Sequence, residues 1–206
     1  MITMKTSTGD LPYLQVRDRP SLSLPLVVLR PLGAGETGPV QGVFDGLSAE
    51  SRRMRFLAAV PHLSPSLLRS LADVDQERHG CWVAEVDGEP VGIGRYIRTE
   101  NDPSVAEIAL EVVDRCQGQG LGRLLVEVVG VAAADVGVTA LLWMMDAHNA
   151  RIRQLAIPLG GHFTREYDVL EGTTPLPSVP EVDARRITRC ARLARQNLAQ
   201  RRPAVA

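Results

Sequence analysis

The sequence contains few cysteines, few aromatic residues and no long apolar run. Its three cysteines form no Cys-x-x-Cys pair and no ligand spacing with the four histidines. We therefore expect reduced thiols in a cytoplasmic protein, and no metal site. Because no run of about 18 apolar residues exists, we expect no transmembrane helix and no membrane partner. The N-terminus lacks a basic region followed by an apolar segment, which argues against a signal peptide.

The charge is nearly balanced in total but uneven along the chain. The net charge is −1, yet residues 181–206 hold seven arginines against Glu181 and Asp183. That segment carries +5, which leaves −6 on the rest of the chain. An acidic body suits a cationic substrate better than a nucleic acid. A hydrophobic content of 45% and a charged content of 23% are typical of one globular domain.

Hydrophobic periodicity and turn residues predict an α/β fold around one sheet, with no internal repeat. Helices are expected at residues 37–46, 48–59, 64–73, 121–136 and 149–159, the second, third and fifth opened by Ser48, Ser64-Pro65 and Asn149. Three strands at 81–86, 90–98 and 105–113 are predicted to form an antiparallel meander, since Asp87-Gly88 is a strong hairpin signal. Further strands are expected at residues 26–30, 138–145 and 163–170. The apolar run at 138–145 predicts a central strand that is buried on both faces.

The two ends of the chain differ in character from the middle. Residues 1–24 show no sustained periodicity and are predicted to form a flexible arm. Residues 172–206 are predicted to hold a Pro-rich linker, at 172–180, followed by a basic C-terminal helix. That helix has a thin apolar stripe, which favours docking on the body or on a second subunit, as in a homodimer, over nucleic-acid binding. The stripe consists of Ile187, Cys190, Ala191, Ala194 and Leu198.

A Gly-rich turn lies between a predicted strand and a predicted helix. Such a turn presents successive backbone N–H groups, and the helix behind it adds the positive end of its dipole, so the device binds anions. Arg115 and Arg123 flank the turn and supply further charge. The G-x-G-x-G spacing fits neither a P-loop nor a dinucleotide fingerprint, and the alternative is a loop that merely turns the chain. The turn consists of Gln117, Gly118, Gln119, Gly120, Leu121 and Gly122.

The pattern Gln117-x-x-Gly120-x-Gly122 resembles the [Q/R]-x-x-G-x-[G/A] motif of the GNAT superfamily of N-acetyltransferases. Ala106-Glu107-Ile108, Asn149 and Leu159-Gly160-Gly161 occur in similar settings, and the resemblance covers about residues 26–170. It implies a GNAT domain over residues 25–171, with a mixed, mostly antiparallel central sheet flanked by helices. It also implies acetyl-CoA as co-substrate, with its pyrophosphate on the turn. Residues 47–56 and 74–96 look more narrowly like bacterial protein-lysine acetyltransferase domains.

Transfer to an amine needs a base, because a free lysine with a pKa of about 10.4 is mostly protonated near pH 7. The resemblance implies that Glu107 is this base, and some burial would raise its pKa and make it more effective. Glu111 is the alternative, since both glutamates share one side of a regular strand unless a bulge intervenes. Alternatively, Glu107 is a strand residue that lies on a solvated face or in an ion pair.

The resemblance further implies which residues contact the cofactor. A backbone N–H at Val112 or Val113 would polarise the thioester carbonyl, and Asn149 would either contact the pantetheine arm or cap its helix. The tyrosine that many family members carry seven residues beyond this asparagine is replaced by Ala156, which leaves the general acid unassigned. The full cofactor set is Val112, Val113, Gln117, Gly118, Gln119, Gly120, Leu121, Gly122, Arg123 and Asn149.

Three functional hypotheses follow. The first is an acetyl-CoA-dependent N-acetyltransferase that acts on a primary amine, with protein lysine as one candidate acceptor. The second is a non-catalytic acyl-CoA-binding sensor or interaction module, which the missing tyrosine supports. The third is a small-molecule amine acetyltransferase, which differs from the first only in its acceptor.

Overall fold

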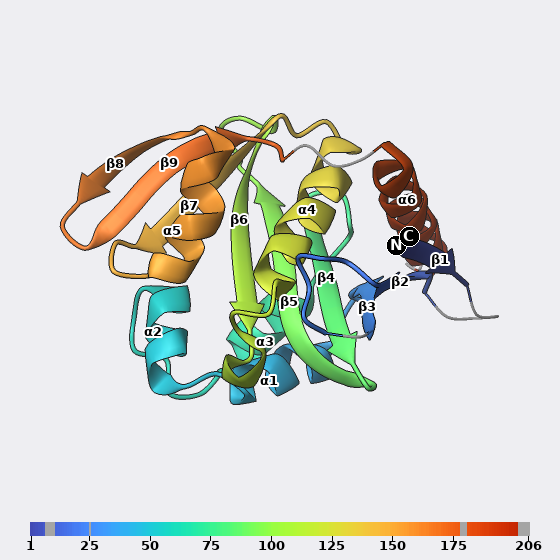
Figure 1. Cartoon of the computed structure of the whole chain (residues 1–206), viewed down its shortest axis with the longest axis horizontal. Coiled ribbons are helices and arrows are strands. Elements are labelled where there is room, and N and C mark those ends of the chain that lie inside the picture. Colours follow the sequence, from blue (N-terminus) through green and yellow to red (C-terminus); the bar gives the residue numbers. More distant parts are fainter. Residues whose placement is uncertain (7–10, 25, 178–180, 202–206) are drawn as a thin grey trace, which may run out of the picture.

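The computed structural model describes residues 1–6, 11–24, 26–177 and 181–201, and these fold around one nine-stranded sheet (Figure 1). The strand order is β1-β2-β3-β4-β5-β6-β7-β9-β8. Neighbouring strands are antiparallel except β6 and β7, which are parallel. The strands are β1 (Ile2–Lys5), β2 (Tyr13–Arg17), β3 (Leu26–Pro31), β4 (His79–Val86), β5 (Glu89–Arg98), β6 (Val105–Val112), β7 (Ala140–Asp146), β8 (His162–Glu166) and β9 (Val169–Pro175).

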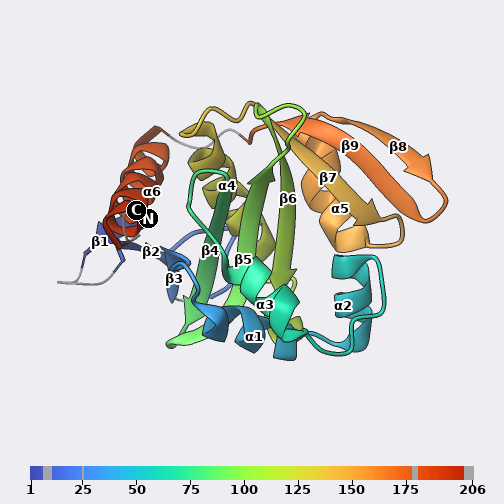
Figure 2. The same ribbon diagram turned by 180° about the vertical axis from the view of Figure 1, so that it is seen from behind.

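Helices cover both faces of this sheet, so the predicted α/β class is confirmed. Helices α4 and α5 lie on the face seen in Figure 1, and α1 and α3 lie on the face seen in Figure 2. Helix α2 stands beside the ends of β6 and β7, and α6 packs beside α4 near β1 to β3. The helices are α1 (Thr37–Asp45), α2 (Ala49–Phe56), α3 (Pro65–Ala72), α4 (Leu121–Ala134), α5 (Ala150–Ala156) and α6 (Glu181–Arg201), with single turns η1 (Asp114–Cys116) and η2 (Ile157–Leu159).

Local sequence signals explain where several helices begin. Ser48, Ser64 and Asn149 precede α2, α3 and α5, and each side-chain oxygen accepts a hydrogen bond of 3.2 Å from a backbone N–H in the first helical turn. Such caps satisfy donors that would otherwise lack a partner, and each contributes about 1 kcal/mol. All three predicted helix starts are therefore confirmed.

The core lies mainly between α4 and the central strands β4, β5 and β6. Helix α4 is apolar on most of its surface and buries ten residues. Gly94 in β5 lets α4 approach the sheet closely, because a Cβ at this position would lie 2.9 Å from Val129 and 3.2 Å from Leu125. Each fully buried Leu or Val contributes about 1.5–3 kcal/mol, so this contact fixes the position of the loop at the start of α4.

The N-terminal residues correct the expectation of a flexible arm. Ile2–Lys5 and Tyr13–Arg17 form strands β1 and β2, and β2 pairs with β3. Leu14 and Val16 are buried beneath α6. This segment is ordered because it pairs with β3 and packs against α6. Its own sequence pattern does not reveal these contacts. Residues 7–10 of the expected arm lie outside the described residues.

The region after α5 also differs from the expectation. The single strand predicted at 163–170 is a hairpin, whose turn at Tyr167 adopts a φ of 52° without glycine. Strand β9 continues to Pro175, so residues 172–175 belong to the sheet and not to a linker; residues 178–180 lie outside the described part. The sheet thus extends beyond both boundaries expected at 25 and 171. Strand β7 is not buried on both faces, since Met144 is 47% exposed.

The basic helix α6 docks on the body of the same chain. All five members of its predicted apolar stripe are buried. Arg192 and Arg195 both pair with Asp135 at the end of α4. Burial acts to raise the pKa of the Asp135 carboxyl, but hydrogen bonds from these two arginines outweigh it and lower that pKa. Among the described residues, no helix is long and apolar enough to cross a membrane.

Candidate active site

The site forms where two neighbouring strands separate. Strands β6 and β7 pair only over Val105–Glu107 and Ala140–Leu142, although both strands continue beyond that point. The other edge of β6 stays in continuous register with β5, so no bulge interrupts β6. A cleft of about 430 Å³ opens at the split, between β6, β7, α2, α5 and the Gly-rich turn.

Alternation along β6 decides which backbone groups face this split. Val113 donates its N–H to Val91 (2.9 Å), and the carbonyl of Val105 accepts from Thr99 (2.9 Å), so odd-numbered residues point their backbone groups toward β5. Even-numbered residues therefore direct theirs toward β7. The N–H groups of Leu110 and Val112 thus face the split.

This alternation distinguishes Val112 from Val113, the two residues whose backbone N–H was predicted to contact the cofactor. Val112 keeps an N–H directed at the cleft, whereas the N–H of Val113 is already donated to Val91 and Val113 does not line the cleft. Sequence reasoning missed Leu110, because the parity of the strand becomes visible only from its pairing.

The Gly-rich turn presents a series of free donors. Gly118 and Gly120 adopt φ values of 74° and 90°, a backbone region that favours glycine. No described residue accepts a hydrogen bond from the backbone N–H groups of residues 118–123. Helix α4 begins at Leu121, so its positive dipole end lies at the same place. The turn is therefore built to bind an anion.

Gln117 holds the turn in place through its side chain. Its Nε2 donates to the carbonyl of Val112 (2.9 Å) and to Asp114 Oδ1 (3.1 Å). Its Oε1 accepts from Arg151 Nη1 of α5 (2.6 Å). Gln117 thereby links the end of β6 to α5, and its side-chain donors already bind protein atoms.

The two candidate bases have different environments. Glu107 lines the cleft and is exposed, and no described residue pairs with its carboxylate. The expected burial of Glu107 is thus not observed. Glu111 is buried, accepts from Arg55 Nε (2.9 Å) and lies 3.9 Å from Arg95 Nη2. The carboxylate of Glu111 is thus engaged by Arg55, whereas that of Glu107 is free to contact a ligand in the cleft.

The remaining predicted residues are partly brought together. Asn149 lines the cleft, and its Oδ1 also caps α5 by accepting from Ile152 N–H. Ala156 is fully buried. Of the residues predicted from sequence, the cleft is lined by Glu107, Glu111, Val112, Gln117, Gly118, Gly120, Gly122, Arg123 and Asn149. Those that do not line it are Val113, Gln119 and Leu121.

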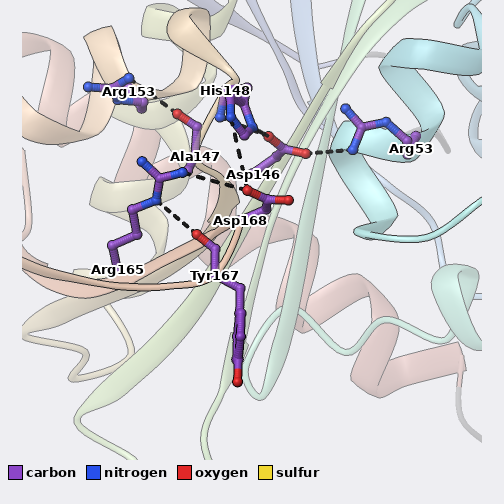
Figure 3. A network of polar contacts seen from close by, with 8 residues as sticks. All are labelled: Arg53, Asp146, Ala147, His148, Arg153, Arg165, Tyr167 and Asp168. Carbon is purple, nitrogen blue, oxygen red and sulfur yellow. Dashed lines mark hydrogen bonds and ion pairs between the residues drawn. The ribbon is translucent and has the colours of Figure 1, made fainter.

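A polar network at the end of β7 joins α2 to the β8–β9 hairpin (Figure 3). Buried Asp146 accepts from Arg53 Nη1 of α2 (2.7 Å) and from the N–H of His148 (2.8 Å). His148 also lies 4.0 Å from Asp168 of the hairpin. Burial acts to raise the pKa of the Asp146 carboxyl, but the hydrogen bonds from His148 and Arg53 outweigh it and lower that pKa.

Sequence reasoning missed Arg53, Arg55 and Asp146. The only available signal was a run of arginines in a short helix with few apolar residues. No group of three or more His, Cys, Asp or Glu side chains suited to a metal ion occurs among the described residues.

The fold and cleft together define a class of protein: an α/β protein with a Gly-rich, anion-binding type of turn beside a split between two parallel strands. The chain matches the acetyltransferase (GNAT) family over residues 48–157. It is also 32% identical over 138 residues to the acetyltransferase PA5475 of Pseudomonas aeruginosa, covering 65% of this chain and 74% of that protein. The chain belongs to the GNAT acetyltransferase family, whose members are acetyl-CoA-dependent N-acyltransferases.

Other similar proteins agree with this assignment. The acetyltransferase Pat of Mycolicibacterium smegmatis is 30% identical over 145 residues; the match covers 67% of this chain but only 42% of Pat. The GNAT domain of S. lividans PAT has a similar fold, with a TM-score of 0.68, 22% identity and coverage of 73% and 91% of the two chains. The fold of yncA from Salmonella typhimurium, solved with its cofactor acetyl-CoA, is similar at a TM-score of 0.58, 16% identity and coverage of 74% and 95%.

Proposed function

We propose that this chain transfers the acetyl group of acetyl-CoA directly to a primary amine, with Glu107 as the general base. One observation carries the proposal: the cleft has a row of free N–H donors at one end and an exposed carboxylate further along. The split between β6 and β7 connects them. The acceptor is an amine of a small molecule or a protein lysine, and the resemblance of residues 47–56 to protein-lysine acetyltransferase domains supports the second.

Acetyl-CoA would bind along the split. Its pyrophosphate would lie on the N–H groups of residues 118–123, with Arg123 and Arg151 adding positive charge. The yncA structure, which contains acetyl-CoA, supports a cofactor of this kind. The pantetheine arm would follow the open edge of β6. There the N–H of Leu110 or Val112 would polarise the thioester carbonyl and stabilise the negative charge that develops on its oxygen.

The reaction needs a neutral amine. Glu107 would take a proton from the ammonium, directly or through water, and the amine nitrogen would then attack the thioester carbon. The C–N bond forms, the nitrogen gives up a second proton to water, the C–S bond breaks, and coenzyme A leaves as a thiolate. A thiol with a pKa of about 8.5 is a good leaving group. Because the position of the usual tyrosine is buried Ala156, we propose that the thiolate takes its proton from water.

An acceptor screen tests this function. Purified protein is incubated with acetyl-CoA and a panel of amines, amino acids and lysine peptides, and thiol release and acetylated product are measured. We expect turnover with at least one acceptor class, and a loss of about 100-fold or more in kcat in Glu107→Gln with unchanged acetyl-CoA affinity. Acetyl-CoA binding without turnover on the whole panel would overturn the proposal and favour a non-catalytic sensor.

A further inference from the structure

The acceptor side of the cleft can be identified from the side chains of β6. Glu111 points to the face of α2 and α3, since it binds Arg55 of α2 and approaches Arg95, whose Nη1 donates to the carbonyl of Leu71 in α3. Leu110 points to the opposite face, toward α4, because both it and Val129 approach Gly94. Glu107 has the parity of Glu111, so both carboxylates belong to the face beneath α2.

Arg55 offers free donors on this side. Its Nε is bound to Glu111, and its guanidinium carbon lies 4.8 Å from the centre of the Phe56 ring. Its side chain is 18% exposed and lines the cleft. No described residue accepts a hydrogen bond from its Nη1 or Nη2, and neither atom is among the buried ones without a partner. The planar end of Arg55 is therefore accessible from the cleft.

The wall behind Arg55 carries an excess of positive charge. Arg95 is 1% exposed, and its Nε and Nη2 have no hydrogen-bond partner. Two guanidinium groups thus face the single carboxylate of Glu111. Burial raises the pKa of the nearby Cys81 thiol to about 11, and burial together with the charge of Arg95 lowers the pKa of His79, so both groups are neutral near pH 7. Neither of these two neighbours adds a negative charge, and the carboxylate that both Arg55 and Arg95 approach within 4 Å is that of Glu111.

An uncompensated buried charge is costly, and a ligand that neutralises it gains affinity. We propose that the acceptor amine carries an anionic group, such as a carboxylate, which binds Nη1 and Nη2 of Arg55 while the amine faces Glu107. This inference rests on the proposed function and specifies its acceptor. A planar guanidinium can hold a carboxylate through two parallel hydrogen bonds, which makes the site selective for that group.

The spacing limits the shape of this acceptor. Glu107 and Glu111 are four residues apart on a regular strand, which is about 13 Å between their Cα atoms. Glu107 and the Arg55 side chain that pairs with Glu111 both line the same cleft, so this distance is the scale that separates the two ends of the acceptor. The amine and the anionic group are therefore separated by several bonds, as in an ω-amino acid or a lysine with an acidic neighbour in a peptide.

Matched acceptor pairs test the inference. The first pair is 6-aminohexanoate and 6-aminohexanamide, which differ only in the charge at one end. The second is a lysine peptide followed by aspartate or by asparagine. We expect the charged member of at least one pair to have a kcat/KM about tenfold or more above its neutral partner. The pair that shows the preference identifies the source of the anionic group.

Variants connect that preference to Arg55. Arg55→Gln is expected to reduce the ratio to about twofold or less, and Arg55→Lys to retain an intermediate ratio because it keeps the charge but loses the planar fork. Arg69→Gln, an exposed position on α3 outside the cleft, removes an equal charge and should keep the wild-type ratio.

The outcomes distinguish this inference from the function on which it rests. A wild type that shows no preference in either pair, or an Arg55→Gln variant that keeps its preference, would overturn the inference alone. A protein that acetylates no amine of either kind would instead overturn the proposed function.

Discussion

The two halves of the cleft that we propose for the cofactor and for the acceptor, called the cofactor half and the acceptor half below, are built in different ways. The cofactor half is a continuous stretch of chain, residues 117–123, whose binding groups are backbone N–H donors. The acceptor half is assembled by α2, which buries no residue of its own and is held by arginine–carboxylate pairs to β6 and β7. The first depends on backbone conformation and the second on side-chain charges, so different substitutions should damage each half.

The largest effect on stability is expected in the acceptor half. Glu111→Ala removes the carboxylate that pairs with Arg55 and lies 3.9 Å from buried Arg95. Breaking such a buried pair typically costs about 3–5 kcal/mol, so we expect the free energy of unfolding in urea to fall by that amount. Glu107→Ala is the matched control on the same strand and face, and its unpaired, exposed side chain should change stability by less than about 0.5 kcal/mol. Equal losses in the two variants would contradict this description of Glu111.

A smaller effect is expected in the cofactor half. Gly120 and Gly137 both have a φ of 90°, but only at Gly120 would a Cβ meet another atom, the carbonyl oxygen of Ser21 at 1.8 Å. Gly137→Ala should therefore cost about 1 kcal/mol through backbone strain alone. Gly120→Ala should cost about 2 kcal/mol more and weaken acetyl-CoA binding by about tenfold or more, because the turn must shift. Calorimetric titration and urea unfolding measure both; equal costs at the two glycines would show that Ser21 does not restrain the turn.

The smallest effect is expected at the polar network beside the hairpin. Arg53 is half exposed, so solvent screens its pair with Asp146, and Arg53→Ala should cost about 0.5–1 kcal/mol at pH 7. The pKa of Asp146 is lowered below its ordinary value of 3.8. The ionised carboxylate therefore stabilises the fold fully above pH 3.8, and this stabilisation is lost as the pH falls through the lower pKa of the folded state. The difference between wild type and variant should therefore shrink at about pH 3. A difference that grows on acidification would contradict this assignment.

The same contrast explains what could be predicted from sequence. The Gly-rich turn, the meander and the capped helix starts were predicted because each is encoded within a few neighbouring residues. The ion pairs that hold α2 were not predicted, since Arg55 and Arg53 bind partners that lie 56 and 93 residues away in the sequence. The β8–β9 hairpin was missed because its turn at Tyr167 contains no glycine, asparagine or proline. Strands β1 and β2 were missed because they depend on β3 and α6.

The role of Glu107 is tested most directly by the pH dependence of kcat in Glu107→Gln. If Glu107 removes the proton from the acceptor, kcat at pH 7 should fall by about 100-fold or more, and the deficit should shrink as rising pH deprotonates the amine without help. Acetyl-CoA affinity should be unchanged. A variant that keeps the wild-type kcat at pH 7, or whose deficit is the same at every pH, would contradict the assignment of Glu107 as the base.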